Sequence, residues 1–515
     1  MKKITLVSLI FLSFCSCQSE QKEAPEKSKT LSKKEMLQDL AIFKSIFEQA
    51  NAGIYKFKSK NQVDSIFELS ESKIDSPLTH REFYTIVWDI IDYTGSCHNN
   101  LSFSDSLKTK IKEKKGFFPF PVKVVENKLR INQQLDDIPL GAEVISINNV
   151  KADNIIKEVT HYTSTDGINR TGKVGFASTS LFPFNYYLRY GYADSFIIEY
   201  KDINNNFLKK TYQSVTYKSF LKNYKQKYSG YSNQINDRGY HLEIIDSLDI
   251  PQISVRTFDF GGEGDTIQKQ YASFLDSSFT VLKRKKYKNL IIDVRDNGGG
   301  SDPNDLLLYS YITQRNFREN TSAYTSFNKV PLPQYFVEEY DDEILDLEDE
   351  LKEEHAIFRD YKYYQIEDFN KEWTPNPLRF EGNIYLLIDE FVASAGSLFA
   401  SMVKSDAHTT VMGIETTGGY YGHTGHIPVR YQLPNSELIL DFFIVNVDQD
   451  VKILKDQKKS DGVKPDIEIN LSLKDFIIQK DTQLNFVIDH IIQSTKNFKN
   501  QNKKVSELKK SENDR

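Results

Sequence analysis

The stretch NIYLLIDEFVASAGSLFASM, residues 383–402, joins two apolar segments through a short acidic turn. The first segment has the continuous apolar character of a buried strand and stops at Asp389 and Glu390. The second segment begins at Ser394 among small residues and continues with helical spacing. A serine at a strand-to-helix turn either caps the helix or exposes its hydroxyl as a nucleophile, and this segment alone favours the cap.

A second stretch, IIDVRDNGGGSDPNDLLLYSYI at residues 291–312, has the same strand-turn-helix pattern. Its strand is predicted to end at Arg295, and the glycines 298–300 allow a tight turn that leaves backbone amides uncovered. We expect Asp302 to cap the following helix, with Pro303 at its first position. Uncovered amides bind either a phosphate or a transient oxyanion, but the Gly-Lys-Ser/Thr ending of a P-loop is absent from the sequence. A turn without any function fits this segment equally well.

Further strands are predicted from other apolar runs between residues 245 and 480. They are IPQISVRTF, NLIIDVR, HTTVMGIE and ELILDFFIVNV. Because helical patterns alternate with these runs, we expect an α/β core with a sheet that is covered on both faces. An acidic insertion at 337–355 is predicted to be a solvated helix. Residues 481–515 are predicted to form a final amphipathic helix and a charged tail.

The N-terminus resembles the signal of a bacterial lipoprotein. A basic MKK precedes a short apolar run, and Ser16 stands directly before Cys17. We therefore predict a signal peptide over 1–17 with a lipid-bearing Cys17, followed by a polar tether over 18–30. An ordinary secretory signal with incidental cysteines is the alternative. With the lipoprotein signal, Cys97 is the only thiol left in the mature chain, which excludes an internal disulfide.

Residues 31–115 have helical patterns with clear end signals. Capping boxes begin at Ser32 and Thr79, and Gly95 is a typical helix stop. We therefore expect His98 to lie in the loop just beyond a helix end.

Residues 116–215 change to short strands and Asn-rich turns, which predicts a separate small β-rich module. The chain has 515 residues, so more than one domain is expected. Its formal net charge is −6, with both signs well mixed, and this pattern is not that of a nucleic-acid-binding protein.

Five short motifs occur in a defined order along the chain. They are IIDVRDNGGG, VASAG, GIETTGG, LPNSEL and DGVKPDIEI. Together they resemble the C-terminal processing (tail-specific) serine peptidase family and its tricorn-like, histidine-using branch, over roughly residues 80–480. The resemblance implies a crotonase/ClpP-like α/β catalytic core at 245–480, with an N-terminal helical segment and a small PDZ-like module at 116–215. Asn149 stands where such modules carry a turn glycine, and the module would hold the ends of peptide chains.

The same resemblance implies a catalytic site. Ser394 matches the nucleophile of the family, and the amides of Gly299 and Ala395 match the donors that stabilise the oxyanion. Gly419 stands where one branch of the family has a catalytic lysine. The segment GSCHNNL instead places His98 at the position of the base in the other branch.

The acid that orients His98 has two candidates in the sequence, Asp461 and Glu415, because Lys459 stands at the aligned position. Cys97 is an alternative nucleophile beside His98, but adjacent side chains generally point apart.

No metal site and no cofactor are predicted, since His423 and His426 lie in a Gly-rich loop without a clear third ligand. The whole pattern predicts a secreted, lipid-anchored serine endopeptidase of the bacterial cell envelope, periplasmic or surface-exposed, that acts through an acyl-enzyme. Its expected partners are peptide or protein substrates and the membrane; nothing predicts its oligomeric state. The alternatives are a catalytically inactive peptide- or ligand-binding protein on the same fold, and an anion-binding module at the glycine turn.

Overall fold

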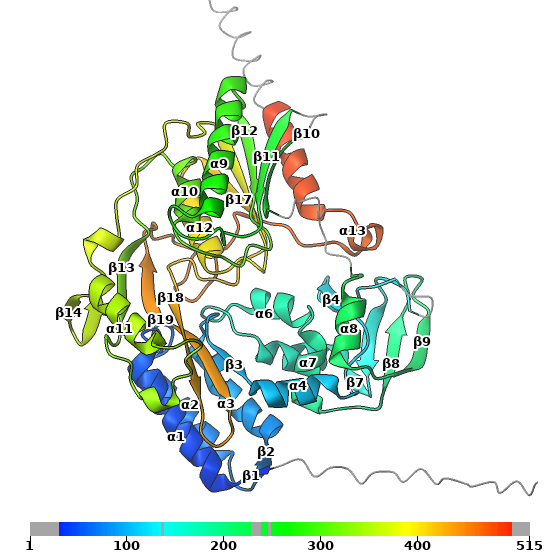
Figure 1. Cartoon of the computed structure of the whole chain (residues 1–515). Helices are drawn as coiled ribbons and strands as arrows, with labels where there is room; N and C mark the ends of the chain where they lie inside the picture. The colour runs from blue at the N-terminus through cyan, green and yellow to red at the C-terminus, as the bar shows by residue number, and fades with distance from the viewer. Residues whose placement is uncertain (1–29, 135–137, 228–237, 246–248, 497–515) are drawn as a thin grey trace, which may run out of the picture.

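The structure is a computed structural model that describes residues 30–134, 138–227, 238–245 and 249–496 (Figure 1). The predicted signal peptide, the lipid-bearing Cys17 and nearly all of the tether lie outside these residues, as does most of the charged C-terminal tail. None of the described helices has the length and apolar character needed to cross a bilayer.

The α/β core is built on a six-stranded sheet in the order β10-β11-β12-β16-β17-β20. β10 is antiparallel to β11, and all other neighbours are parallel. The strands are β10 (Tyr240–Ile245), β11 (Ile250–Val255), β12 (Asn289–Asp293), β16 (Asn383–Ile388), β17 (Thr409–Gly413) and β20 (Ile467–Glu468). The apolar runs IPQISVRTF, NLIIDVR, NIYLLIDE and HTTVMGIE thus form strands as predicted.

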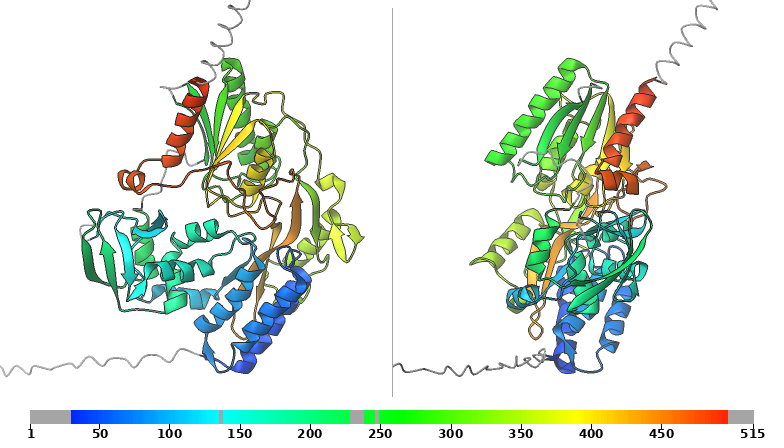
Figure 2. Two further views of the ribbon diagram at one scale, coloured as in Figure 1. Left: turned by 180° about the vertical axis from the view of Figure 1, so that it is seen from behind. Right: turned by 90° about the vertical axis from the view of Figure 1, so that its right-hand side faces the viewer.

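Helices cover both faces of this sheet, as the apolar strands predicted. α9 (Thr266–Lys285), α10 (Asn304–Ser310) and α12 (Ala395–Lys404) pack on one face, and the helical residues 482–496 pack on the other (Figures 1 and 2). Side chains of the strands alternate between these two layers, which is why the strands are apolar along their whole length.

The strands predicted for a single core sheet are divided between two sheets, and the second sheet was not predicted. Its order is β14-β15-β13-β19-β18, and β3 pairs with β19. The strands are β3 (Asn100–Ser102), β13 (Asn320–Thr325), β14 (Ile357–Arg359), β15 (Lys362–Tyr364), β18 (Thr424–Gln432) and β19 (Ile439–Gln449). The run ELILDFFIVNV is therefore part of this second sheet and not of the core sheet. It packs on the N-terminal helices, where the Phe442 and Phe47 ring centroids are 4.9 Å apart.

The N-terminal region is helical, as predicted. It contains β1 (Thr30–Leu31), α1 (Lys33–Ala50), α2 (Lys60–Ser72), β2 (Leu78–Thr79), α3 (His80–Thr94) and α4 (Asp105–Glu113). Both predicted capping boxes are present, at Ser32 and at Thr79. Helix α3 ends where Gly95 adopts a φ of 72°, a left-handed conformation that costs glycine little. The chain then enters the loop that carries His98.

Residues 116–215 form a β-rich unit with an apolar core of its own. Its sheet has the order β4-β5-β6-β8-β9, with β7 beside β6. The elements are β4 (Val122–Val125), β5 (Lys128–Ile131), β6 (Glu143–Ile147), β7 (Val150–Lys151), α5 (Ala152–Val159), η1 (Thr160–Tyr162), α6 (Arg170–Ala177), α7 (Phe182–Tyr190), β8 (Ser195–Lys201) and β9 (Phe207–Gln213), and α8 (Tyr217–Tyr224) follows. Asn149 has a φ of 65°, as expected for an Asn in the place of a turn glycine. The PDZ-like interpretation of this unit stays a prediction.

The acidic insertion contains α11 (Glu343–Glu354), a largely solvated helix as predicted. Leu347 and Leu351 anchor it to the apolar core that the N-terminal helices form with the second sheet. Short elements complete the fold, namely η2 (Pro333–Tyr335), η3 (Glu367–Phe369) and α13 (Leu473–Ile478).

Candidate active site

The carboxyl ends of β12 and β16 lie side by side in the core sheet, and hydrogen bonds join the turns that follow them. The Ala393 N–H donates to the Asn297 carbonyl at 3.1 Å. The Asp296 N–H donates to Asp389 Oδ1 at 3.0 Å. The glycine turn and the serine turn, which stand almost a hundred residues apart in the sequence, therefore form one site.

Ser394 occupies the turn between β16 and α12 in a strained backbone conformation. Its φ of 52° and ψ of −135° are values that residues other than glycine rarely adopt. Its side chain is half-buried and makes no capping hydrogen bond to α12, so the cap that the segment alone favoured is not formed. One turn further, Ser397 is fully buried and donates its hydroxyl to the Ser394 carbonyl at 2.8 Å, which is a structural role.

The two backbone amides predicted to stabilise an oxyanion differ in their hydrogen bonding. Ala395 is the first residue of α12, where an N–H group has no acceptor within the helix. The Gly299 N–H instead donates to Asn297 Oδ1 at 2.9 Å. The prediction that Gly299 offers an uncovered amide is therefore wrong for this conformation, because the Asn297 side chain folds back over the turn.

The helix after the glycine turn begins one residue later than predicted. Pro303, and not Asp302, is the N-cap of α10. The Asp302 carboxylate lies beside the imidazole of His426, with 3.4 Å between Oδ2 and Nδ1.

His98 lies at the same site, in the loop that follows α3. Its ring packs between the rings of His423 and Phe443, with centroid distances of 4.8 and 4.6 Å. Burial lowers the pKa of His98 despite the opposing charge of Asp166, so the imidazole is neutral near pH 7 and able to accept a proton. Among the described residues, no hydrogen bond joins His98 to Ser394.

Cys97 is the neighbour that His98 and Ser394 share. Its Sγ lies 3.4 Å from His98 Nδ1, and the Ser394 backbone N–H hydrogen-bonds to the same sulfur. The expectation that the side chains of residues 97 and 98 point apart is therefore wrong. Burial, and then the charge of Asp166, raise the pKa of the thiol well above its usual value, which makes the sulfur a poor nucleophile at neutral pH.

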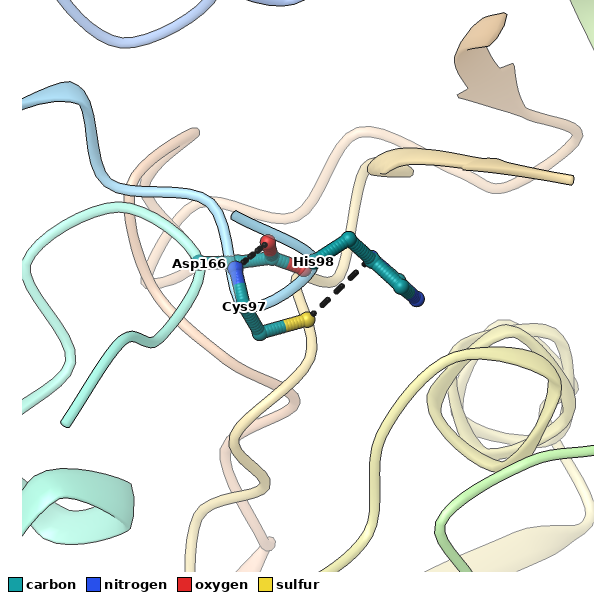
Figure 3. Close-up of side chains that lie close together, drawn as sticks. All are labelled: Cys97, His98 and Asp166. Carbon is teal, nitrogen blue, oxygen red and sulfur yellow. Dashed lines mark hydrogen bonds between the residues drawn. The ribbon is translucent and has the colours of Figure 1, made fainter. Parts of the chain in front are cut away.

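Asp166 is the carboxylate of this site that sequence reasoning missed. It is fully buried, and it accepts the Cys97 N–H at 3.0 Å and the Gly419 N–H at 2.8 Å. Figure 3 shows it beside Cys97, with the His98 ring on the other side; one side-chain atom of each of the three residues lies within 4.8 Å of the others. Asp166 comes from the 116–215 unit, where the only sequence signal is an Asp-Gly pair that marks a turn.

The two acids proposed from sequence to orient His98 lie elsewhere. Asp461 forms an ion pair with Lys464, and Glu415 accepts the Gly462 N–H at 3.0 Å. Across the described part of the chain, neither has a hydrogen bond or an ion pair with His98. The carboxylate beside the Cys97–His98 pair is Asp166.

A cavity of about 840 Å³ lies next to this site. Lys56, Tyr421 and Lys459 are among the residues that line it. The Lys56 ammonium donates to the Val447 carbonyl at 2.9 Å, and the Val447 N–H donates to the His423 carbonyl at 2.9 Å. Two hydrogen bonds therefore connect Lys56, at the cavity, to the backbone of His423, whose ring packs against His98.

One protein-family model matches the core of this chain. Residues 249–469 match the family model of Peptidase family S41. This range contains both turns of the site, whereas His98 and Asp166 come before it. A comparison with curated protein sequences finds no match.

Solved structures align with this chain at low sequence identity. Mature CPAF complexed with lactacystin aligns with a TM-score of 0.58 and 12% identity, over 89% of this chain and 97% of that chain. Another structure of mature CPAF gives a TM-score of 0.58 and 12% identity, over 89% and 96%. The tricorn protease aligns at 14% identity over 90% of this chain and 37% of that chain, with a TM-score of 0.37. The likeness to CPAF extends beyond the core, because 89% of this chain is covered.

Proposed function

We propose that this chain, whose residues 249–469 match the model of Peptidase family S41, is a serine endopeptidase whose nucleophile is Ser394. One observation carries the proposal: Ser394 is held in a strained turn, without a capping bond, directly against the glycine turn. Such backbone strain costs about 1–3 kcal/mol, and it clusters where function requires a side chain to be presented. A nucleophilic serine at a strand-to-helix turn is presented in this manner.

His98 is the base in this proposal. It takes the proton of the Ser394 hydroxyl as the oxygen attacks the scissile carbonyl, and it returns that proton to the leaving amine as the C–N bond breaks. Water then attacks the acyl-enzyme ester and gives a proton to His98. His98 passes this proton to the Ser394 oxygen as the ester C–O bond breaks, which releases the acid product and restores the Ser394 hydroxyl. The hydrogen bond between Ser394 and His98 forms when substrate binds, since catalytic hydrogen bonds often tighten only in the complex.

The N–H of Ala395 is the proposed oxyanion donor, because it belongs to the first turn of α12 and points out of the helix. Gly299 contributes its lack of a side chain, which lets the glycine turn lie against Ser394. Asp166 is the proposed positioning residue for the base. Its hydrogen bonds to the Cys97 and Gly419 amides fix the loop on which His98 stands.

The decisive experiment is labelling with a fluorophosphonate, which reacts with activated serines. We expect labelling and peptide cleavage by the wild-type protein and neither by Ser394→Ala. Ser397→Ala is the matched control, since it removes a hydroxyl one turn away that donates to the Ser394 carbonyl. Labelling of Ser394→Ala would reject the nucleophile, and a wild-type protein without label would favour the inactive binding protein. Cleavage of a peptide library by the unlabelled wild-type protein would define the substrate.

We further propose that the protein is lipid-anchored through Cys17 in the bacterial cell envelope. The support is the basic start, the apolar run and the Ser16-Cys17 pair. Expression with an alkynyl fatty acid should label the wild-type protein but not Cys17→Ser. Label in both proteins would show that another residue carries the lipid.

The 116–215 unit is the proposed receptor for peptide ends, in the manner of a PDZ module. Its support is the five-strand path of the sheet and the Asn149 turn. Peptides with free and with amidated C-termini should differ in affinity for the Ser394→Ala protein; equal affinities would reject this role.

A further inference from the structure

The cluster of greatest interest outside the Ser394–His98 pair surrounds His426. Its Nε2 lies 2.9 Å from Glu319 Oε1, and its Nδ1 lies 3.4 Å from Asp302 Oδ2. Asp302 follows the glycine turn, Glu319 immediately precedes β13, and His426 lies in β18. One ligand atom from each of the three residues lies within 4.8 Å of the others.

Two further acidic side chains border this cluster. Asp305 is 1% exposed, and within the described ranges neither of its carboxylate oxygens has a hydrogen-bond partner. Burial, and then the charges of Asp302 and Glu319, raise the pKa of Asp305 well above its usual value, so Asp305 belongs to the same cluster. Burial raises the pKa of Glu354 above its usual value; the charges of Glu319 and Asp302 add to this effect, and the hydrogen bond from Gln365 and the charge of His426 oppose it. The described structure contains no ion pair between a Lys or Arg and any of these four acids.

Several buried polar atoms here also have no partner in the described residues. Apart from the 2.9 Å contact with His426 Nε2, Glu319 Oε1 has no polar partner in the described residues. His355 is 1% exposed, and both of its ring nitrogens are unpartnered. Burial, and then the positive charge of His426, lower the pKa of His355, so His355 borders the same cluster. Buried polar atoms without partners are rare and point to a missing ion or water.

A second histidine between two carboxylates shows what a satisfied cluster looks like. His161 lies 2.6 Å from Asp89 Oδ1 and 3.3 Å from Asp92 Oδ2. There, Lys73 pairs with Asp89 and Lys173 pairs with Asp92, so two cations offset the acids. The His426 cluster has the same histidine and carboxylate arrangement without such cations in the described chain.

We propose that Asp302, Glu319 and His426 bind a divalent transition-metal ion of the Zn²⁺ class. An imidazole with two carboxylates is a donor set that suits zinc, and three protein ligands leave a position for water. The ion would bind one His426 ring nitrogen in place of a proton and would bring further positive charge to a site with four acidic residues. The isolated sequence motif offered no third ligand for His426, but the fold brings Asp302 and Glu319 to it.

The ion would fasten the elements that frame the active site. Asp302 lies two residues beyond Gly300, the last glycine of the glycine turn, and His426 lies three residues beyond His423, whose ring packs on His98. Binding would therefore tie the glycine turn to the wall behind the proposed base. This is a positioning role, and it does not depend on the assignment of the nucleophile.

The test uses the full chain after treatment with a chelator. Titration calorimetry with Zn²⁺ should find one site per chain, and the melting temperature should rise with Zn²⁺ concentration. His426→Gln and Glu319→Gln should weaken binding at least about tenfold and lose this rise. His161→Gln is the matched control and should bind as the wild type does. Asp302→Asn should weaken binding too, and because this side chain is half-exposed, the variant should fold as the wild type does.

The absorption spectrum of Co²⁺ distinguishes this site from the Cys97, His98 and Asp166 cluster. We expect weak visible bands without a sulfur-to-cobalt charge-transfer band, and loss of these bands in His426→Gln but not in Cys97→Ser. A charge-transfer band that Cys97→Ser abolishes would overturn the proposal by placing the ion at the other cluster. Absence of binding to the wild type, or equal binding by His426→Gln, would overturn it as well.

Discussion

Gly299 is in contact with Ser394 across the two turns, so that a Cβ at residue 299 would lie 2.5 Å from the Ser394 Cβ. The Gly299 φ of 106° is also unfavourable for any residue with a side chain. We expect Gly299→Ala to displace Ser394 and to lower kcat/KM about 100-fold or more, since small displacements of a nucleophile have effects of this size.

Gly298→Ala is the matched control for that variant. A Cβ at residue 298 meets no atom within 4 Å, and its φ lies outside the left-handed region. Cleavage of a peptide substrate and thermal melting, measured on both variants, separate the effect on the site from the effect on stability. Equal losses of activity at equal stability would show that the contact with Ser394 does not position the nucleophile.

Replacement of Cys97 tests the alternative nucleophile. The contact between Cys97 Sγ and His98 Nδ1 is close, but the raised thiol pKa argues against a thiolate. Cys97→Ser keeps a polar atom beside the imidazole, and we expect kcat to fall by less than about tenfold, with fluorophosphonate still bound to Ser394. Loss of all cleavage in Cys97→Ser, together with alkylation of the wild-type thiol by iodoacetamide, would instead support Cys97 as the nucleophile.

The pH dependence of cleavage tests the role of Asp166. His98 must be neutral to act as a base, and burial holds its pKa below the ordinary value while Asp166 raises it. Removal of this negative charge destabilises the imidazolium, so Asp166→Asn should move the acid limb of kcat/KM to lower pH and reduce kcat. Glu415→Gln repeats the measurement for the acid proposed from sequence. A shift in Glu415→Gln alone would restore that assignment.

The local parts of this site were predictable because their signals are local. Gly95 marks the end of α3, so the position of His98 beyond a helix follows from neighbouring residues. The turn at Ser394 is predictable for the same reason, since an apolar strand and a helical pattern meet there.

Contacts between distant segments were not predictable. Asp166 is buried only because a loop of the 116–215 unit docks on the core. The Asn297 side-chain oxygen accepts a hydrogen bond from the Gly299 N–H, and the spacing of the glycines in the sequence does not reveal this contact. The apolar run of β19 predicts a strand but not its neighbours, and the strand pairs with β18 and β13 instead of the core sheet. The position of β19 is associated with its packing against the N-terminal helices, which lie more than 300 residues earlier in the chain.

The buried charges below the site predict a large loss of stability on substitution. Arg295 is 1% exposed and binds both Asp293 and Asp481 at 2.8 Å. Arg295→Met removes the counter-charge beside Asp481 and leaves Asp293 with Arg256 alone, and removal of one partner from a buried ion pair costs about 3–5 kcal/mol. Urea unfolding measures this difference. Arg379→Met, which breaks a more exposed pair with Glu381, should cost less than about 1 kcal/mol; equal costs would contradict the prediction.

The His161 cluster predicts a loss of stability at alkaline pH. Burial lowers the pKa of His161, but hydrogen bonds to Asp89 and Asp92 outweigh this effect and raise it to about 9. The folded-state pKa thus lies above the unfolded value of about 6.5, so the stabilisation is complete below pH 6.5 and disappears as the pH rises through 9. Because the His161 side chain is 36% exposed, we expect about 1–2 kcal/mol after solvent screening. His161→Gln keeps a polar group without the charge, so urea unfolding should show it less stable than the wild type at pH 6 and equally stable at pH 10. A difference that is the same at both pH values would mean that the proton on His161 does not contribute.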